Sequence, residues 1–236
     1  MKRAALRMAA IVAAPLMLAA CNVVMTKEPL FSAADAAGAP PLRPGVWLIF
    51  KEPGCKFDEQ APFTDWPDCA GGGLVTSSDV AGHKNGAPKG VLEHSPLILA
   101  AGEPRIAQLQ VSVDVSAQAS ASASGDASAS ASATATGPQS NPYGYAGIRP
   151  DKFDDQGRVI AFTSWPVQCG PPPPVDKNGN STAMGTLKPL PGIEMKPGDA
   201  VCTTHSKDAL RAAAKASEAW ADQPPHQSRW LRDGER

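Results

Sequence analysis

The sequence predicts an α+β fold that is mainly antiparallel β, with an internal strand/turn repeat and one C-terminal helix. Apolar runs of strand length recur between turn residues from residue 43 to residue 165. The phrase "FTDWPDC" at 63–69 returns as "FTSWPVQC" at 162–169. A single amphipathic helical pattern follows near the C-terminus. These three observations set the predicted fold class.

The N-terminus has the pattern of an export signal. Three basic residues precede an apolar run of 13 residues, Met8 to Ala20. This run is too short to span a bilayer comfortably and has the length of a signal-peptide core. It ends in "LAAC", Leu18 to Cys21. We therefore assign residues 1–20 to a signal peptide.

The "LAAC" stretch resembles the lipobox of bacterial lipoproteins, in which a Leu and two small residues precede a cysteine. The resemblance implies cleavage before Cys21 and acylation of its sulfur and new amino terminus, with palmitate among the acyl chains. Two or more such chains anchor a protein stably to a bilayer. Asn22 follows where an aspartate would signal inner-membrane retention, which implies the outer membrane, facing the periplasm or the cell surface. The alternative is an ordinary secretory signal that is cut near Ala20.

Composition and charge exclude several other classes. The chain carries a net charge of −1, and removal of the three basic residues of the signal leaves −4. This acidic balance gives no electrostatic basis for binding nucleic acid. No later apolar run reaches about 18 residues, so no spanning helix is expected. No G-x-S-x-G, H-E-x-x-H or Gly-rich phosphate-binding motif is present, and the sequence predicts no cofactor.

The mature chain divides into a tether and one domain. Residues 21–41 contain "SAADAAGAPP", a run of small residues that ends in proline, and are predicted to form the tether. Residues 42–236 are predicted to form a single globular β-rich domain. Its expected strands are "RPGVWLIF" at 43–50, "GLVTSS" at 73–78, "PLILAA" at 96–101, "IAQLQVSVDV" at 106–115 and "RVIAFTSW" at 158–165.

A low-complexity Ala/Ser arm occupies residues 117–139. The strand before it continues into the arm with the same alternation of side chains. A hairpin from about 105 to 149 is consistent with a loop of odd length, which would place Leu109 opposite Tyr143 and Ala107 opposite Tyr145. Two interpretations of the arm stay open: a flexible polar arm, and the outer part of a β-ribbon.

The repeated phrase extends backward in both copies, as "CKFDEQAPFTDWPDC" at 55–69 and "DKFDDQGRVIAFTSWPVQC" at 151–169. Each copy is predicted as a turn, a strand, a Trp-Pro stop and a cysteine. Trp66 and Trp165 are then expected to anchor the core, because a buried tryptophan removes a large area from water. The functional alternative is that these rings stack on sugars.

Four cysteines remain when Cys21 is set aside, and export favours two disulfides among them. The predicted pairs are Cys55–Cys69 and Cys169–Cys202, because each copy of the repeat can then be locked before the two halves meet. The rival scheme joins Cys69 to Cys169 and leaves Cys55 with Cys202.

One helix is expected at about 207–221. Ser206 is its predicted N-cap, and two prolines end the pattern. Small and apolar residues share one face, while Arg211, Lys215 and Glu218 share the other.

No metal site is predicted. Asp176, Asn178 and Asn180 alternate as in a calcium loop, but the glycine at the sixth position and the glutamate at the twelfth are missing. Cys202-x-x-His205 is half of a zinc site without a second pair at useful spacing. The four histidines share no spacing.

The mature region resembles an uncharacterised lipoprotein family of Gram-negative bacteria in "PLRPGVW", "DWPDCA", "SWPVQCG" and the helix after Cys202. The resemblance implies no known activity. We therefore expect a non-enzymatic envelope lipoprotein that binds the bilayer through Cys21 and a protein or cell-wall partner through its domain. The alternative is a periplasmic hydrolase that uses the acidic pairs Asp58-Glu59 and Asp154-Asp155, although no catalytic residue is assigned. A cleft that contains Asp58 or Asp154 with a raised pKa would favour the hydrolase.

Overall fold

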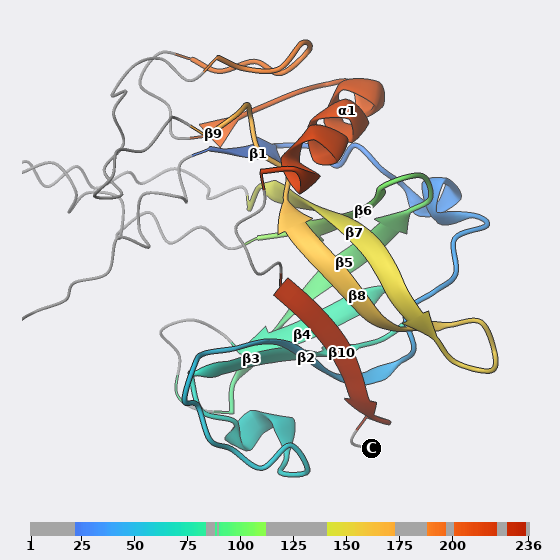
Figure 1. Ribbon diagram of the computed structural model, residues 1–236, viewed down its shortest axis with the longest axis vertical. Coiled ribbons are helices and arrows are strands. Elements are labelled where there is room, and N and C mark those ends of the chain that lie inside the picture. The colour runs from blue at the N-terminus through green and yellow to red at the C-terminus, as the bar shows by residue number, and fades with distance from the viewer. Residues whose placement is uncertain are drawn as a thin grey trace, which may run out of the picture.

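The protein is an antiparallel β-barrel with one α-helix packed on its outside (Figure 1). The structure, a computed structural model, describes residues 22–83, 88, 90–111, 141–172, 188–196, 201–220 and 226–234. The barrel strands are β2 (Gly45–Lys51), β3 (Ala70–Val75), β4 (Asp79–His83), β5 (Leu92–Ala100), β6 (Arg105–Gln110), β7 (Tyr143–Phe153), β8 (Val159–Pro166) and β10 (His226–Arg232).

The strands form a closed ring. Those from β2 to β8 each pair with the next one along the chain, and β10 pairs with both β8 and β2. The predicted α+β class with an internal repeat is therefore wrong. The stretches that form β4 and β10 are short and half polar, so the sequence pattern did not indicate strands there. Because β10 joins β8 to β2, closure of the sheet could not be predicted from the sequence without it.

Smaller elements lie outside the ring. They are β1 (Val23–Thr26), the 3-10 helices η3 (Ala33–Ala36) and η4 (Phe63–Asp65), β9 (Val201–Cys202) and the helix α1 (Lys207–Glu218). The helix was expected at about 207–221, and its predicted cap is confirmed, because Ser206 accepts a hydrogen bond from the Ala209 N–H at 3.2 Å. No helix in the described part of the chain is long and apolar enough to cross a bilayer.

One apolar cluster fills part of the barrel interior. It takes side chains from all eight barrel strands, which only an interior position allows. Within it, the ring centroids of Trp47 and Phe162 lie 5.3 Å apart. The strand members of the cluster are Trp47, Val75, Val80, Leu97, Leu99, Ala107, Ala146, Ile148, Val159, Phe162 and Trp230.

Two further clusters pack on the outside of the barrel wall. The first lies beneath α1 and the N-terminal segment, and the second lies beneath the loop that contains η4. Strand β2 is therefore buried on both faces: Trp47 points inward, while Val46 and Leu48 meet the η4 loop. Burial on both faces explains the continuous apolar run from Val46 to Leu48, whereas Phe50 at the end of the strand is 44% exposed.

The segment that was predicted as a tether belongs to the fold. Strand β1 pairs with β7 and β9, and Phe31 is only 3% exposed. The side chain of Gln108, buried in the wall, accepts hydrogen bonds from the main-chain N–H groups of Leu30 and Phe31 at 2.9 and 2.8 Å and donates to the Phe31 carbonyl at 3.0 Å. These bonds hold residues 30 and 31 against β6.

The two copies of the repeat share a turn and then diverge. Asp58 Oδ1 accepts from the Gln60 N–H at 2.8 Å, and Asp154 Oδ1 accepts from the Gln156 N–H at 3.0 Å. The first copy continues as a loop with η4, whereas the second forms the β7–β8 hairpin. Two prolines and the shorter spacer of the first copy leave no room for a strand. The predicted strand is therefore confirmed in the second copy, where it is β8, and is wrong in the first copy.

The tryptophans and cysteines of the repeat behave as predicted. Trp66 and Trp165 are 1% and 2% exposed, so their role as core anchors is confirmed. The disulfides join Cys55 to Cys69 and Cys169 to Cys202, with Cα–Cα distances of 5.7 and 5.9 Å. The first disulfide closes the η4 loop, and the second ties the chain after β8 to β9 just before α1.

The pairing of β6 with β7 differs by one residue from the predicted register. Leu109 lies opposite Gly144 and not opposite Tyr143. A shift of one residue moves every side chain to the other face of a strand. Tyr145 consequently points outward, where its hydroxyl lies 2.5 Å from Thr26 Oγ1. The Ala/Ser arm at 117–139 lies outside the described residues.

A close approach at Gly147 predicts a packing-sensitive site. A Cβ at Gly147 would lie 2.4 Å from the Trp165 ring, which is buried and held on the far side by α1. We expect Gly147→Ala to lower the free energy of unfolding by about 1–3 kcal/mol through overpacking. Gly82→Ala is the matched control on another barrel strand, because the nearest atom to its Cβ would be 4.0 Å away. Urea unfolding with intact disulfides measures both, and equal stabilities would contradict the proposed contact.

Candidate functional site

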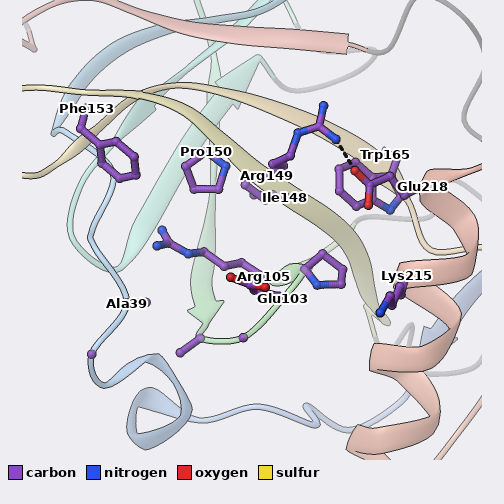
Figure 2. Close-up of a pocket in the computed structure, with 14 residues that line it drawn as sticks. Ala39, Glu103, Arg105, Ile148, Arg149, Pro150, Phe153, Trp165, Lys215 and Glu218 are labelled. Atoms are coloured by element: carbon purple, nitrogen blue, oxygen red, sulfur yellow. Dashed lines mark hydrogen bonds and ion pairs between the residues drawn. The ribbon is translucent and has the colours of Figure 1, made fainter.

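A groove of about 720 Å³ lies between α1, β7 and the turn that joins β5 to β6 (Figure 2). We call it the α1–β7 groove. Its volume falls within the range of small-molecule sites. It is lined by Gly38, Ala39, Ala101, Gly102, Glu103, Pro104, Arg105, Ile148, Arg149, Pro150, Phe153, Trp165, Lys215 and Glu218.

Trp165 fixes the helix wall of the groove. Its indole Nε1–H donates to the Ala214 carbonyl of α1 at 2.8 Å, and its ring packs closely against Gly147 of β7. One turn further along α1, Ser217 Oγ accepts from the Gln168 N–H at 2.9 Å. The helix is therefore attached to the chain of β8 and its continuation, and the groove has a preformed wall.

Asp35 fixes the opposite, N-terminal wall. Its carboxylate pairs with Lys207 Nζ of α1 at 2.6 Å, and its main-chain carbonyl accepts from the Ala101 N–H at 2.8 Å. This residue thus connects η3, α1 and the β5–β6 turn. The hydrogen bond from Lys207, followed by that from Ser32, lowers the Asp35 pKa from 3.8 to about 2.

The charges in the groove form one paired set and one unpaired set. Arg149 pairs with Glu218 of α1, as the dashed line in Figure 2 shows, and its Nε lies 3.9 Å from Asp151. Within the described residues, by contrast, neither Arg105 nor Lys215 has a carboxylate within ion-pair distance. The Arg105 side chain donates from Nη1 to the Pro40 carbonyl at 3.1 Å. Burial lowers the pKa of the Arg105 guanidinium.

The acidic turns that the sequence offered as catalytic candidates do not enter the groove. Asp154 accepts from the Arg158 N–H at 2.8 Å and forms an ion pair with that guanidinium at 2.7 Å. Burial acts to raise the Asp154 pKa, but the hydrogen bonds from Arg158 and Gln156 outweigh it and lower the pKa. A general acid needs the opposite shift. Both turn aspartates therefore organise their own turns.

The remaining sequence candidates lie elsewhere. Cys21 and the calcium-like stretch from Asp176 to Asn180 lie outside the described residues. Cys202 is bonded to Cys169, so its thiolate is not free to bind zinc beside His205. Within the described residues no cluster of three His, Cys, Asp or Glu side chains could hold a metal ion.

Sequence reasoning missed the groove because its residues come from distant segments. Lys215 and Glu218 were placed on the polar face of the helix, and Arg105 was read only as the end of a turn. The pairing of β6 with β7, which brings Arg105 opposite Ile148, depends on the barrel register. A polar helix face whose positive charges outnumber its acids was the one available signal. Comparison of the chain with protein families, curated proteins and solved structures gives no match.

The Asp35 ion pair predicts an acid-sensitive groove wall. The Asp35 pKa in the folded protein is about 2 and lies below its ordinary value. The contribution of the Asp35 carboxylate to the free energy of unfolding is therefore complete above about pH 4 and is lost as the pH falls toward 2. Asp35→Asn should reduce the loss of stability over this window, measured by chemical unfolding at pH 5, 4, 3 and 2. Lys207→Gln removes the main partner and should move the remaining loss to higher pH. Identical pH profiles for all three proteins would contradict this role.

Proposed function

We propose that this protein is a lipid-anchored, non-enzymatic binding protein of the bacterial envelope. It is held at the outer membrane through acylated Cys21, and it binds its ligand in the α1–β7 groove. The observation that carries the binding role is the preformed groove, whose walls are held by Trp165 and by the Asp35–Lys207 pair. A site with fixed walls binds without a large ordering cost.

The start of the fold supports the lipid anchor. All the strands in the described part of the chain lie C-terminal to Cys21, and the first of them, β1, begins two residues after it. The main-chain carbonyl of Asn22 accepts a hydrogen bond from the Cys169 N–H at 2.9 Å, and the Asn22 side chain donates from Nδ2 to the Gly170 carbonyl at 3.1 Å. A chain cut before Cys21 thus keeps its complete barrel. Acyl chains on Cys21 would be joined to the fold without a linker, beside the Cys169–Cys202 disulfide.

The hydrolase alternative lacks the feature that would favour it. Asp58 and Asp154 do not line the groove, and Glu59 pairs with Arg229 of β10 at 2.5 Å. The first acidic turn therefore attaches the η4 loop to the strand that closes the barrel. The second holds the tip of the β7–β8 hairpin through Asp154 and Arg158. Asp58, Glu59 and Asp154 thus each have a structural partner that accounts for them.

Labelling with radioactive palmitate tests the anchor. We expect the wild-type protein to take up the label in a Gram-negative host and Cys21→Ala to take up none, with the variant left uncut by the lipoprotein peptidase. Label in the Cys21→Ala protein would contradict the assignment.

A substitution at Asn22 tests the proposed sorting to the outer membrane. By resemblance to the sorting rule of Gram-negative lipoproteins, Asn22→Asp should keep the palmitate label and move the protein from the outer-membrane to the inner-membrane fraction of a sucrose gradient. Asn22→Gln is the control, because it keeps an amide and should stay in the outer-membrane fraction. Co-migration of both variants with the outer membrane would refute the proposed address.

A further inference from the structure

We infer that the α1–β7 groove binds a small organic carboxylate with a single negative charge and an apolar body. The inference rests on the proposed function in taking this groove as the ligand site. It adds the chemical class of the ligand, which follows from the charges and the apolar surface that the groove presents.

The charge balance of the groove calls for one negative charge. Arg149 and Glu218 neutralise each other across the gap between β7 and α1. Arg105 and Lys215 remain as two positive charges without a carboxylate partner among the described residues, and Glu103 adds one negative charge at the exposed turn. The net charge left for a ligand is +1. A phosphate monoester, with a charge of about −1.5 to −2, would overcompensate it beside two glutamates.

Arg105 is the group that gains most from an anion. It is half-buried, and the carbonyl of Pro40 is a neutral acceptor that leaves the guanidinium charge uncompensated. A partly desolvated charge without a counterion is costly, and the lowered pKa of Arg105 has the same origin. A guanidinium presents paired N–H donors that match a carboxylate. Figure 2 shows Arg105 across the groove from Pro150, with Lys215 on the α1 side.

The apolar part of the groove lies on β7. Ile148 and Pro150 border the groove, and Phe153 extends it toward the tip of the hairpin. Phe153 is 49% exposed and is one of the few large apolar side chains on the described surface that is not covered. An exposed aromatic ring beside an uncompensated cation fits a ligand with an apolar body and one anionic end. The carboxylate would lie at the Arg105 guanidinium, which points toward Ala39 and away from Lys215, and the body on Pro150 and Phe153. Lys215 adds positive potential from the α1 side of the groove.

Three probes with the same apolar body and different charges test this inference. They are N-acetyl-phenylalanine, N-acetyl-phenylalaninamide and phenylalaninamide, with charges of −1, 0 and +1 at about pH 5.5, where the carboxylate is ionised and the amine is protonated. The protein is the mature chain as purified from the expressing cell, and binding is measured by calorimetry and by the shift of the Trp165 indole N–H resonance. We expect the acid to bind about tenfold or more tightly than the neutral amide, because it gains a charge-assisted hydrogen bond. The cation should bind no better than the amide.

Variants assign the effect to the groove. Arg105→Gln should weaken binding of the acid by about tenfold, and Lys215→Gln, which removes a more distant positive charge, should weaken it by about two- to threefold; both should leave binding of the amide unchanged. Lys152→Gln is the matched control, because Lys152 is exposed on β7 but does not line the groove. Lys215 is exposed on α1, so its substitution keeps the test valid even where Arg105→Gln fails to fold.

The outcomes separate this inference from the proposed anchor. Equal binding of acid and amide, or no effect of Lys215→Gln, would overturn the carboxylate assignment. Tighter binding of 2-phenylethyl phosphate than of N-acetyl-phenylalanine would overturn the inference that the ligand carries a single negative charge. A protein that takes up palmitate but fails these tests retains its anchor and loses the ligand class. A protein that passes them without palmitate retains the ligand class and loses the anchor.

Discussion

The pairing of β10 with two strands at once is the constraint on which the rest of the structure depends. Arg229 lies opposite Leu48 of β2 and opposite Ala161 of β8. Without β10, both of those strands would present open edges, which are sites of aggregation. Closure also gives Trp47 and Phe162 an interior to fill and keeps β7 curved around it. The groove lies at the end of that wall, where β7 meets the β5–β6 turn and α1.

Because the interior cluster occupies only one face of each strand, the outer apolar face needs its own cover. The disulfide-closed η4 loop covers β2 and β3, while the N-terminal segment and α1 cover β5, β6 and β7. Each disulfide therefore stabilises a cover and not the barrel wall itself. The α1 cover stops short of the hairpin tip, where Phe153 remains exposed, and this boundary is where the groove forms.

Local features of this fold could be predicted from the sequence, and the features that depend on closure could not. The apolar run around Trp47, the Ser206 cap and both disulfides follow from short stretches of residues. The repeat misled the fold assignment because the two copies share the Asx turn and a buried tryptophan, which a loop and a hairpin can both supply. Strand β10 carries two arginines and a serine, so its alternation was too weak to indicate the last strand.

The candidate site was even less visible in the sequence, for a related reason. Arg105 and Lys215 have no pattern in common, and they face the same groove only because the β6–β7 register and the Trp165–Ala214 hydrogen bond place β6 and α1 on two sides of β7. A carboxylate that enters the groove therefore meets donors whose positions are set by the barrel wall, so that recognition of the anion follows from closure of the ring.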